Sequence, residues 1–264
     1  MQYFRFALSL ILAGVSALCA PRDPLTEPFE GQRLRLEKEL LELRASGWDA
    51  AYRTDYGTAR ARFAELLREA PEHPDSNLSM AAVIWQEYLF HTRRLQSQMY
   101  GKGSSFYAGA GSGKEGAEGD SIDAAVKAAF GENISRAVVA AERLVAAHPN
   151  HPDALYFLGS AYGVRAAFEA SAERKFWAAL RDGLRAVKQH QKVIRLDPGN
   201  YDALLTVGLY HYVVGSIPQP FRAIAMLAGV RGSKKQGMEE LELVTRSGFY
   251  NRNDARTMLV ALYR

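Results

Sequence analysis

The chain has 264 residues, of which 48% are hydrophobic and 23% are charged, and its formal net charge is +4 at pH 7. These values are typical of a globular protein and exclude global disorder. The charge is mild for this length, and we find no basic stripe or aromatic platform, so we expect no nucleic-acid partner.

The first twenty residues, MQYFRFALSLILAGVSALCA, differ from the rest of the chain. Arg5 precedes an apolar run from Phe6 to Val15, and small residues follow, which is the layout of a secretory signal peptide. The run is shorter than the roughly 20 apolar residues of a membrane-crossing helix. The sequence therefore predicts a signal peptide over 1–20 and an exported protein, periplasmic or associated with the outer envelope.

Cys19 is the single cysteine, and it leaves two fates for the N-terminus open. One is cleavage of the signal peptide; the other is a lipid anchor on Cys19, although a lipobox needs a small residue where this chain has Leu18. Cleavage after Ala20 would leave a mature protein without cysteine or disulfides. We expect contact with a membrane only through the signal peptide or this anchor.

Residues 21–33 contain three prolines and are predicted to form a linker. From Leu34 onward, helix-forming runs alternate with proline-containing turns, and no segment has the sustained alternation of strands. The domain over 34–264 is therefore predicted to be all-α. Its Gly/Ser-rich insertion over about 101–121 is predicted to be a flexible surface loop.

A helix end, a proline, a short turn and a new helix recur around Pro71, Pro149 and Pro198. After each proline, four residues at offsets of zero, three, four and seven share one helical face. They are Leu78, Ala81, Ala82 and Trp85, then Leu155, Leu158, Gly159 and Tyr162, then Leu204, Val207, Gly208 and His211. We expect the small third residue to let a neighbouring helix approach and the large fourth residue to fill the space beside it.

This pattern resembles the tetratricopeptide repeat family, whose first helix carries a large apolar residue, a leucine, a small residue and an aromatic. On the second helix, Ala59 and Phe63 fit the family's spacing before Pro71. The three prolines are separated by 78 and 49 residues, whereas the family period is about 34. The chain is thus similar to the exported bacterial type, with degenerate, lengthened repeats. The resemblance implies a right-handed α-α superhelix, a solenoid, over 34–264.

Two segments near the C-terminus have particular expectations. Phe221 to Val230 is apolar on several sides, and we expect it to be buried against the next helix pair or to touch a membrane. Asp254 to Arg264 is predicted to be a first helix, with Leu259, Val260 and Tyr263 in the family's places. Solenoid ends normally carry a cap, so we expect either a truncated sequence or a last helix that packs against something else.

The insertion does not predict a nucleotide site. Gly111, Gly113 and Gly116 have the spacing of a dinucleotide-binding loop, but such a loop needs a preceding strand and a following helix. The segment before it, Tyr88 to Tyr100, is predicted to be helical instead. We expect no cofactor.

The histidines do not predict a metal site. His148 and His151 lie three residues apart, but they belong to a turn that contains two prolines, and no cysteine or further histidine is near in sequence. We expect turn chemistry instead, with Asn150 and Asp153 capping the next helix. No motif fixes a catalytic triad or carboxylate pair, so we also expect no catalytic residue.

The candidate binding residues are aromatic side chains on or beside the first helices: Trp85, Tyr88, Tyr156, Tyr210 and Tyr212. They either fill gaps between repeats or line a concave groove that grips a peptide. The family resemblance implies a non-catalytic scaffold or adaptor for a protein or peptide partner in the cell envelope. The alternative is a periplasmic small-molecule or lipid-binding component of transport machinery.

Overall fold

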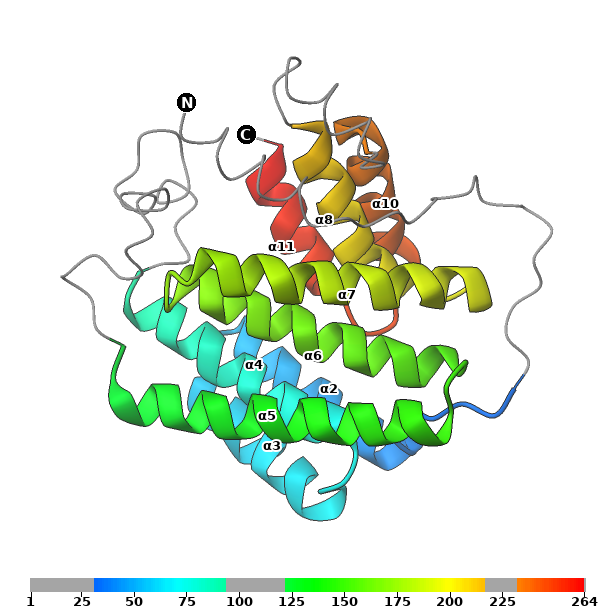
Figure 1. Ribbon diagram of the computed structural model, residues 1–264. Helices are drawn as coiled ribbons and strands as arrows, with labels where there is room; N and C mark the ends of the chain where they lie inside the picture. The colour runs from blue at the N-terminus through cyan, green and yellow to red at the C-terminus, as the bar shows by residue number, and fades with distance from the viewer. Residues whose placement is uncertain (1–30, 94–121, 217–231, 264) are drawn as a thin grey trace. The chain divides into compact units, whose positions relative to one another are not determined.

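The computed structural model describes residues 31–93, 122–216 and 232–263. Within these residues all regular structure is helical, with nine α-helices, one short 3-10 helix and no strand, which confirms the predicted all-α class (Figure 1). None of these helices combines the length and apolar character needed to cross a membrane. The predicted signal peptide, the insertion over 101–121 and the segment Phe221 to Val230 lie outside the described residues.

The chain divides into two compact units. Of the described residues, the N-terminal unit contains 32–93 and 122–186, and the C-terminal unit contains 187–216, 232–263 and Gly31. The boundary falls within one helix, α7 (Phe176–Leu196).

Helices of the N-terminal unit pack mainly against the next helix in the chain. Besides the first half of α7, they are α2 (Lys38–Tyr52), α3 (Tyr56–Glu69), α4 (Pro74–His91), α5 (Ala124–Ala147) and α6 (Pro152–Ser171). Each of α2 to α5 packs against its successor, and α4 also packs against α2 and α6 (Figure 1). Helix α4 therefore contacts four other helices of this unit.

Burial follows that pattern. The first halves of α4 and α6 are buried on all sides, over Pro74–Ile84 and Pro152–Gly159. In α3, by contrast, Ala59, Phe63 and Leu66 form a single buried stripe. The α2–α3 contact requires a glycine, since a Cβ on Gly47 would lie 2.6 Å from the Phe63 ring. The middle of the stack therefore lies at α4 and α6.

The C-terminal unit is centred on α10 (Lys234–Ser247), which packs against α8 (Leu204–Gly215), α11 (Arg252–Leu262) and the short η3 (Tyr201–Ala203). Leu204, Val244 and Ala255 join these elements in one buried cluster. On α11, Leu259 is buried but Val260, predicted to occupy a small-residue packing place, is 65% exposed.

Two glycines set the crossing of α8 and α10. A Cβ on Gly237 would lie 2.5 Å from the carbonyl oxygen of Gly208 and 2.5 Å from the amide nitrogen of Tyr212. Gly208, predicted to allow close approach, would carry a Cβ only 3.1 Å from the Gly237 oxygen. One turn along α8, the buried His211 places Nδ1 2.6 Å from Oε2 of Glu240. The helix backbones are therefore in direct contact.

The helix starts revise the predicted repeat register. Both α4 and α6 begin with the same tripeptide, His-Pro-Asp, at 73–75 and 151–153, with histidine as N-cap and proline in the first turn. Aligning the helices on this tripeptide places Ala81, which is fully buried, opposite the buried Gly159. Ala82 is buried as well, but it lies one residue later. In the copy after Pro71, the residue equivalent to Gly159 is therefore Ala81, and the predicted register of this copy is one residue too late.

Candidate peptide-binding site

Three buried aspartates occupy the same place in successive repeats. They follow Pro71, Pro149 and Pro198 by four residues, and their exposed fractions are 2%, 2% and 3% for Asp75, Asp153 and Asp202. A buried carboxylate is costly unless it is paired or hydrogen-bonded. The partners of these three carboxylates therefore indicate which parts of the chain each aspartate holds in place.

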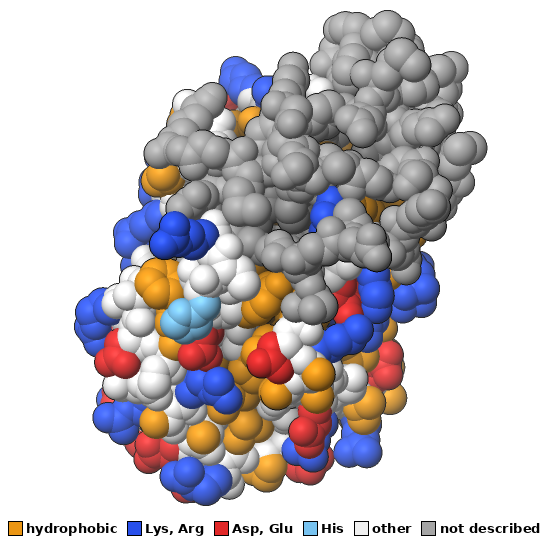
Figure 2. Space-filling model, turned by 90° about the vertical axis from the view of Figure 1, so that its left-hand side faces the viewer, with side chains coloured by type: hydrophobic (Ala, Val, Ile, Leu, Met, Phe, Trp, Pro, Cys, Tyr) orange, Lys and Arg blue, Asp and Glu red, His pale blue; other side chains and the backbone are white. Residues whose placement is uncertain are grey.

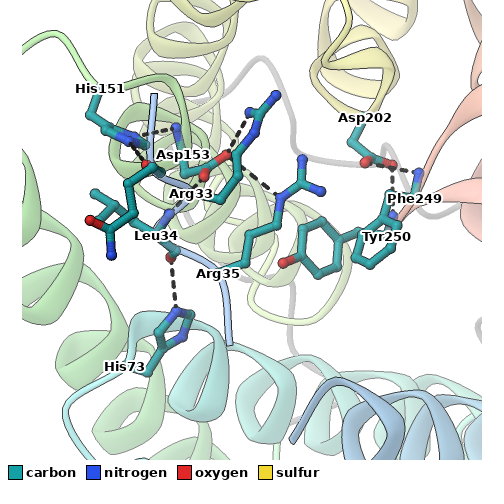
Figure 3. A network of polar contacts seen from close by, with 10 residues as sticks. Arg33, Leu34, Arg35, His73, His151, Asp153, Asp202, Phe249 and Tyr250 are labelled. Carbon is teal, nitrogen blue, oxygen red and sulfur yellow. Dashed lines mark hydrogen bonds and ion pairs between the residues drawn. The ribbon is translucent and has the colours of Figure 1, made fainter. Parts of the chain in front are cut away.

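Two of the aspartates hold parts of their own helical unit. Asp75 lies 2.6 Å from Nε of Arg44 on α2. Asp202 accepts backbone N–H hydrogen bonds of 2.9 Å from Phe249 and Tyr250 (Figure 3). It accepts a third, also of 2.9 Å, from Asn251, in the turn before α11. Asp75 and Asp202 thus each fix one helical element to another.

Asp153 instead holds a non-helical segment that precedes α2. Its carboxylate accepts a 2.9 Å hydrogen bond from the amide of Leu34 and a 3.2 Å one from Nη1 of Arg33, and Nε of Arg35 lies at 3.7 Å (Figure 3). We call residues 32–35 the strap. It includes Gln32 and Arg33, which the sequence assigned to the linker.

Two histidines complete the contacts to the strap. Nδ1 of His73 accepts from the amide of Asp75 at 3.2 Å, and Nδ1 of His151 accepts from the amide of Asp153 at 3.1 Å. A neutral imidazole that accepts at Nδ1 carries its proton at Nε2. Nε2 of His73 therefore donates to the carbonyl of Leu34 at 3.2 Å, and Nε2 of His151 to that of Gln32 at 2.7 Å.

Each imidazole thus caps a helix with one nitrogen and holds the strap's main chain with the other. We call the two tripeptides, 73–75 and 151–153, the His-Pro-Asp corners. The carbonyls of Gln32 and Leu34 lie two residues apart, so the two corners hold alternate residues of the strap's main chain. Main-chain contacts combined with selected side chains are how proteins bind extended peptides.

The corners also correct the predicted capping of α6. The cap is the side chain of His151, whereas Asn150 and Asp153 were predicted. His148 lies beside it, with the two ring centroids 6.0 Å apart. Among the described residues, no group of three or more His, Cys, Asp and Glu side chains is arranged to hold a metal ion.

Protonation of His73 is expected to weaken its corner. Burial lowers the pKa of the His73 imidazole, despite the opposing effect of the Asp75 carboxylate. The unfolded chain, with the ordinary pKa of 6.5, therefore takes up the proton more readily than the folded protein. Stability from neutral His73 should be complete above pH 6.5 and lost as pH falls through the lower, folded-state pKa.

Urea unfolding at several pH values checks this dependence. It compares the free energy of unfolding of the wild type with that of the variant His73→Gln. The advantage of the wild type over the variant should shrink as pH falls below 6.5. A constant difference between pH 7.5 and 5 would contradict it.

The predicted aromatic binding residues are not gathered at the strap. Trp85 is partly buried and donates from Nε1 to Oγ of Ser171 at 2.9 Å, Tyr88 is partly buried, and Tyr156 is only 5% exposed. Tyr210 and Tyr212 belong to the C-terminal unit, where Nζ of Lys234 lies 5.1 Å from the Tyr212 ring. Tyr156 in particular offers almost no surface to a partner.

Tyr162, a predicted packing residue, lies in a charged cluster between α6 and α7. Its hydroxyl donates to Glu142 at 3.0 Å, and the guanidinium carbon of Arg165 lies 5.2 Å from its ring. Arg165 and Arg185 both bond to the fully buried Asp182, at 2.5 Å and 3.2 Å. Burial, followed by the hydrogen bond to Glu142, raises the pKa of Tyr162. The contacts of this cluster are between helices.

Charges of both signs share the visible surface. On the face in Figure 2, Lys and Arg side chains are interspersed with Asp and Glu, and hydrophobic side chains lie between them.

Comparison with protein-family models, curated proteins and solved structures found no match for this chain.

Proposed function

We propose that the protein is a non-catalytic helical-repeat scaffold that binds an extended segment of a protein partner in the cell envelope. The observation that carries this proposal is the strap, a non-helical segment held through its main chain by side chains at the starts of α4 and α6. A surface that holds one extended segment in this way has the chemistry to hold another.

The stacking of the N-terminal unit supports the tetratricopeptide-like, right-handed superhelix that we propose for the architecture. Helix α4 contacts α3 and α5 along the chain, and it also contacts α2 and α6. In solenoids each repeat packs on its neighbours in this way and leaves a continuous surface for partners. The His-Pro-Asp corners repeat along that stack.

Location in the envelope is proposed from the sequence of residues 1–20. An apolar run of signal-peptide length follows Arg5. In an oxidising compartment a chain whose single cysteine is Cys19 must depend on packing, since it cannot form an internal disulfide.

Affinity capture from envelope extracts tests the proposed function. The full chain is used as bait, and a matched bait carries Phe90→Ser, which changes an exposed side chain at the end of α4. We expect both baits to retain the same protein partner after chemical cross-linking. Recovery of a tightly held small molecule and no protein would contradict the scaffold and favour the small-molecule alternative.

A further inference from the structure

We propose that the His-Pro-Asp corners form a binding site for extended segments with two arginines separated by one residue, and that the strap occupies this site in cis. A partner segment of the same chemistry binds by displacing the strap. This inference rests on the proposed function and specifies the class of partner.

The first step is that three of the strap's hydrogen bonds do not depend on its side chains. The corners bond the carbonyl of Gln32, the amide of Leu34 and the carbonyl of Leu34. Every non-proline residue carries these groups. A foreign extended chain can therefore satisfy the same hydrogen bonds without adaptation of the corners.

The second step is that charge provides the selectivity. The Asp153 side chain is 2% exposed, and the arginines that flank Leu34 both approach it. A segment without a cation at these positions would leave the buried carboxylate paired only with a backbone amide, which is costly. Arginine suits the site better than lysine, because its planar group offers several donors and is more weakly hydrated. The site therefore selects Arg-x-Arg.

The third step is that the strap can leave without unfolding a helix. It lies outside α2, which begins at Lys38. The arginine side chains remain 33% and 24% exposed, and Gln32 is exposed. Leu36, at the junction with α2, is buried and keeps the following chain in place. Exchange thus breaks the contacts of residues 32–35 and leaves the stacked helices intact.

The fourth step concerns competition. A tethered segment acts at an effective concentration of about a millimolar. A free peptide identical to the strap must therefore compete against this concentration in the wild-type chain. Weakening the strap's own hold should reveal the intrinsic affinity of the site.

The test is a fluorescence anisotropy titration with a labelled peptide that copies residues 31–38, GQRLRLEK. It is added to the full wild-type chain and to the full-chain double variant Arg33→Glu/Arg35→Glu. We expect the variant to bind the peptide at least ten-fold more tightly, because its acidic strap is repelled by Asp153. The milder double variant Arg33→Ala/Arg35→Ala should show a gain in the same direction, and it serves as the test if the acidic variant does not fold by circular dichroism.

Two controls establish the site. Adding Asp153→Asn to the alanine variant should reduce peptide affinity at least ten-fold, whereas adding Glu72→Gln, on a side chain that is 85% exposed, should leave it unchanged. A peptide with glutamate at both arginine positions should not bind. Equal peptide affinities for wild type and folded double variants, or equal binding of the acidic peptide, would overturn the inference. Partner capture would then still stand, so this failure is distinguishable from failure of the scaffold.

Discussion

Replacing Gly237 by alanine is expected to lower the free energy of unfolding of the C-terminal unit by about 3 kcal/mol. The new Cβ would lie 2.5 Å from two backbone atoms, the Gly208 oxygen and the Tyr212 nitrogen. Backbone cannot rotate away as the end of a flexible side chain can, so α8 and α10 must move apart. That separation also disturbs the buried His211–Glu240 pair one turn away.

Hydrogen exchange measured by mass spectrometry is the suitable readout, because it reports on each helix separately. Amides of α8 and α10 should lose protection in Gly237→Ala. The matched control is Gly131→Ala in α5, where a Cβ would meet no atom within 4 Å. That substitution should be neutral or stabilise by up to about 1 kcal/mol, because alanine favours the helix. Equal effects of the two substitutions would show that α8 and α10 do not cross at Gly237.

Replacing Asp202 by alanine is expected to destabilise the C-terminal unit by about 3–4 kcal/mol. The substitution removes one buried carboxylate and leaves the amides of Phe249, Tyr250 and Asn251 without this acceptor. Since these amides form the turn before α11, that helix should detach first. Asp202→Asn should cost less, because its one carbonyl oxygen can still accept from Tyr250 and Asn251.

The protection of the α11 amides against hydrogen exchange measures this effect. Glu239→Gln is the control, since it removes the same charge from an exposed side chain of α10. It should change stability by less than about 0.5 kcal/mol. Unchanged α11 protection in Asp202→Ala would rule out the proposed role of this carboxylate.

The helical class was predictable from sequence because its signals are local. Pro71 and Pro149 mark turns between runs of helix formers, and small residues recur after them. The helices themselves start later, at Pro74 and Pro152. The repeated His-Pro-Asp tripeptide was the available signal for those starts, and using it would have corrected the one-residue shift at Ala82.

The strap and the helix that meets Gly208 were missed for a different reason. Asp153 meets Leu34 across 119 residues, and no spacing rule along one chain connects them. Gly237 is likewise explained only by Gly208 on another helix. A buried aspartate can be read as a helix cap from local sequence, as Asp153 was, because capping is the usual role of that residue near a helix start.

The length of the chain between the strap and Asp153 has a kinetic consequence. Hairpins such as α2–α3 close over few residues, whereas the strap closes a loop of more than a hundred, and such contacts are slow to form. We therefore expect residues 32–35 to dock last in refolding, because the groups that hold them come together only after α4 and α6 have packed. During folding, the His-Pro-Asp corners would therefore be formed before the strap occupies them, and in that interval a partner segment with two arginines could bind without displacing the strap.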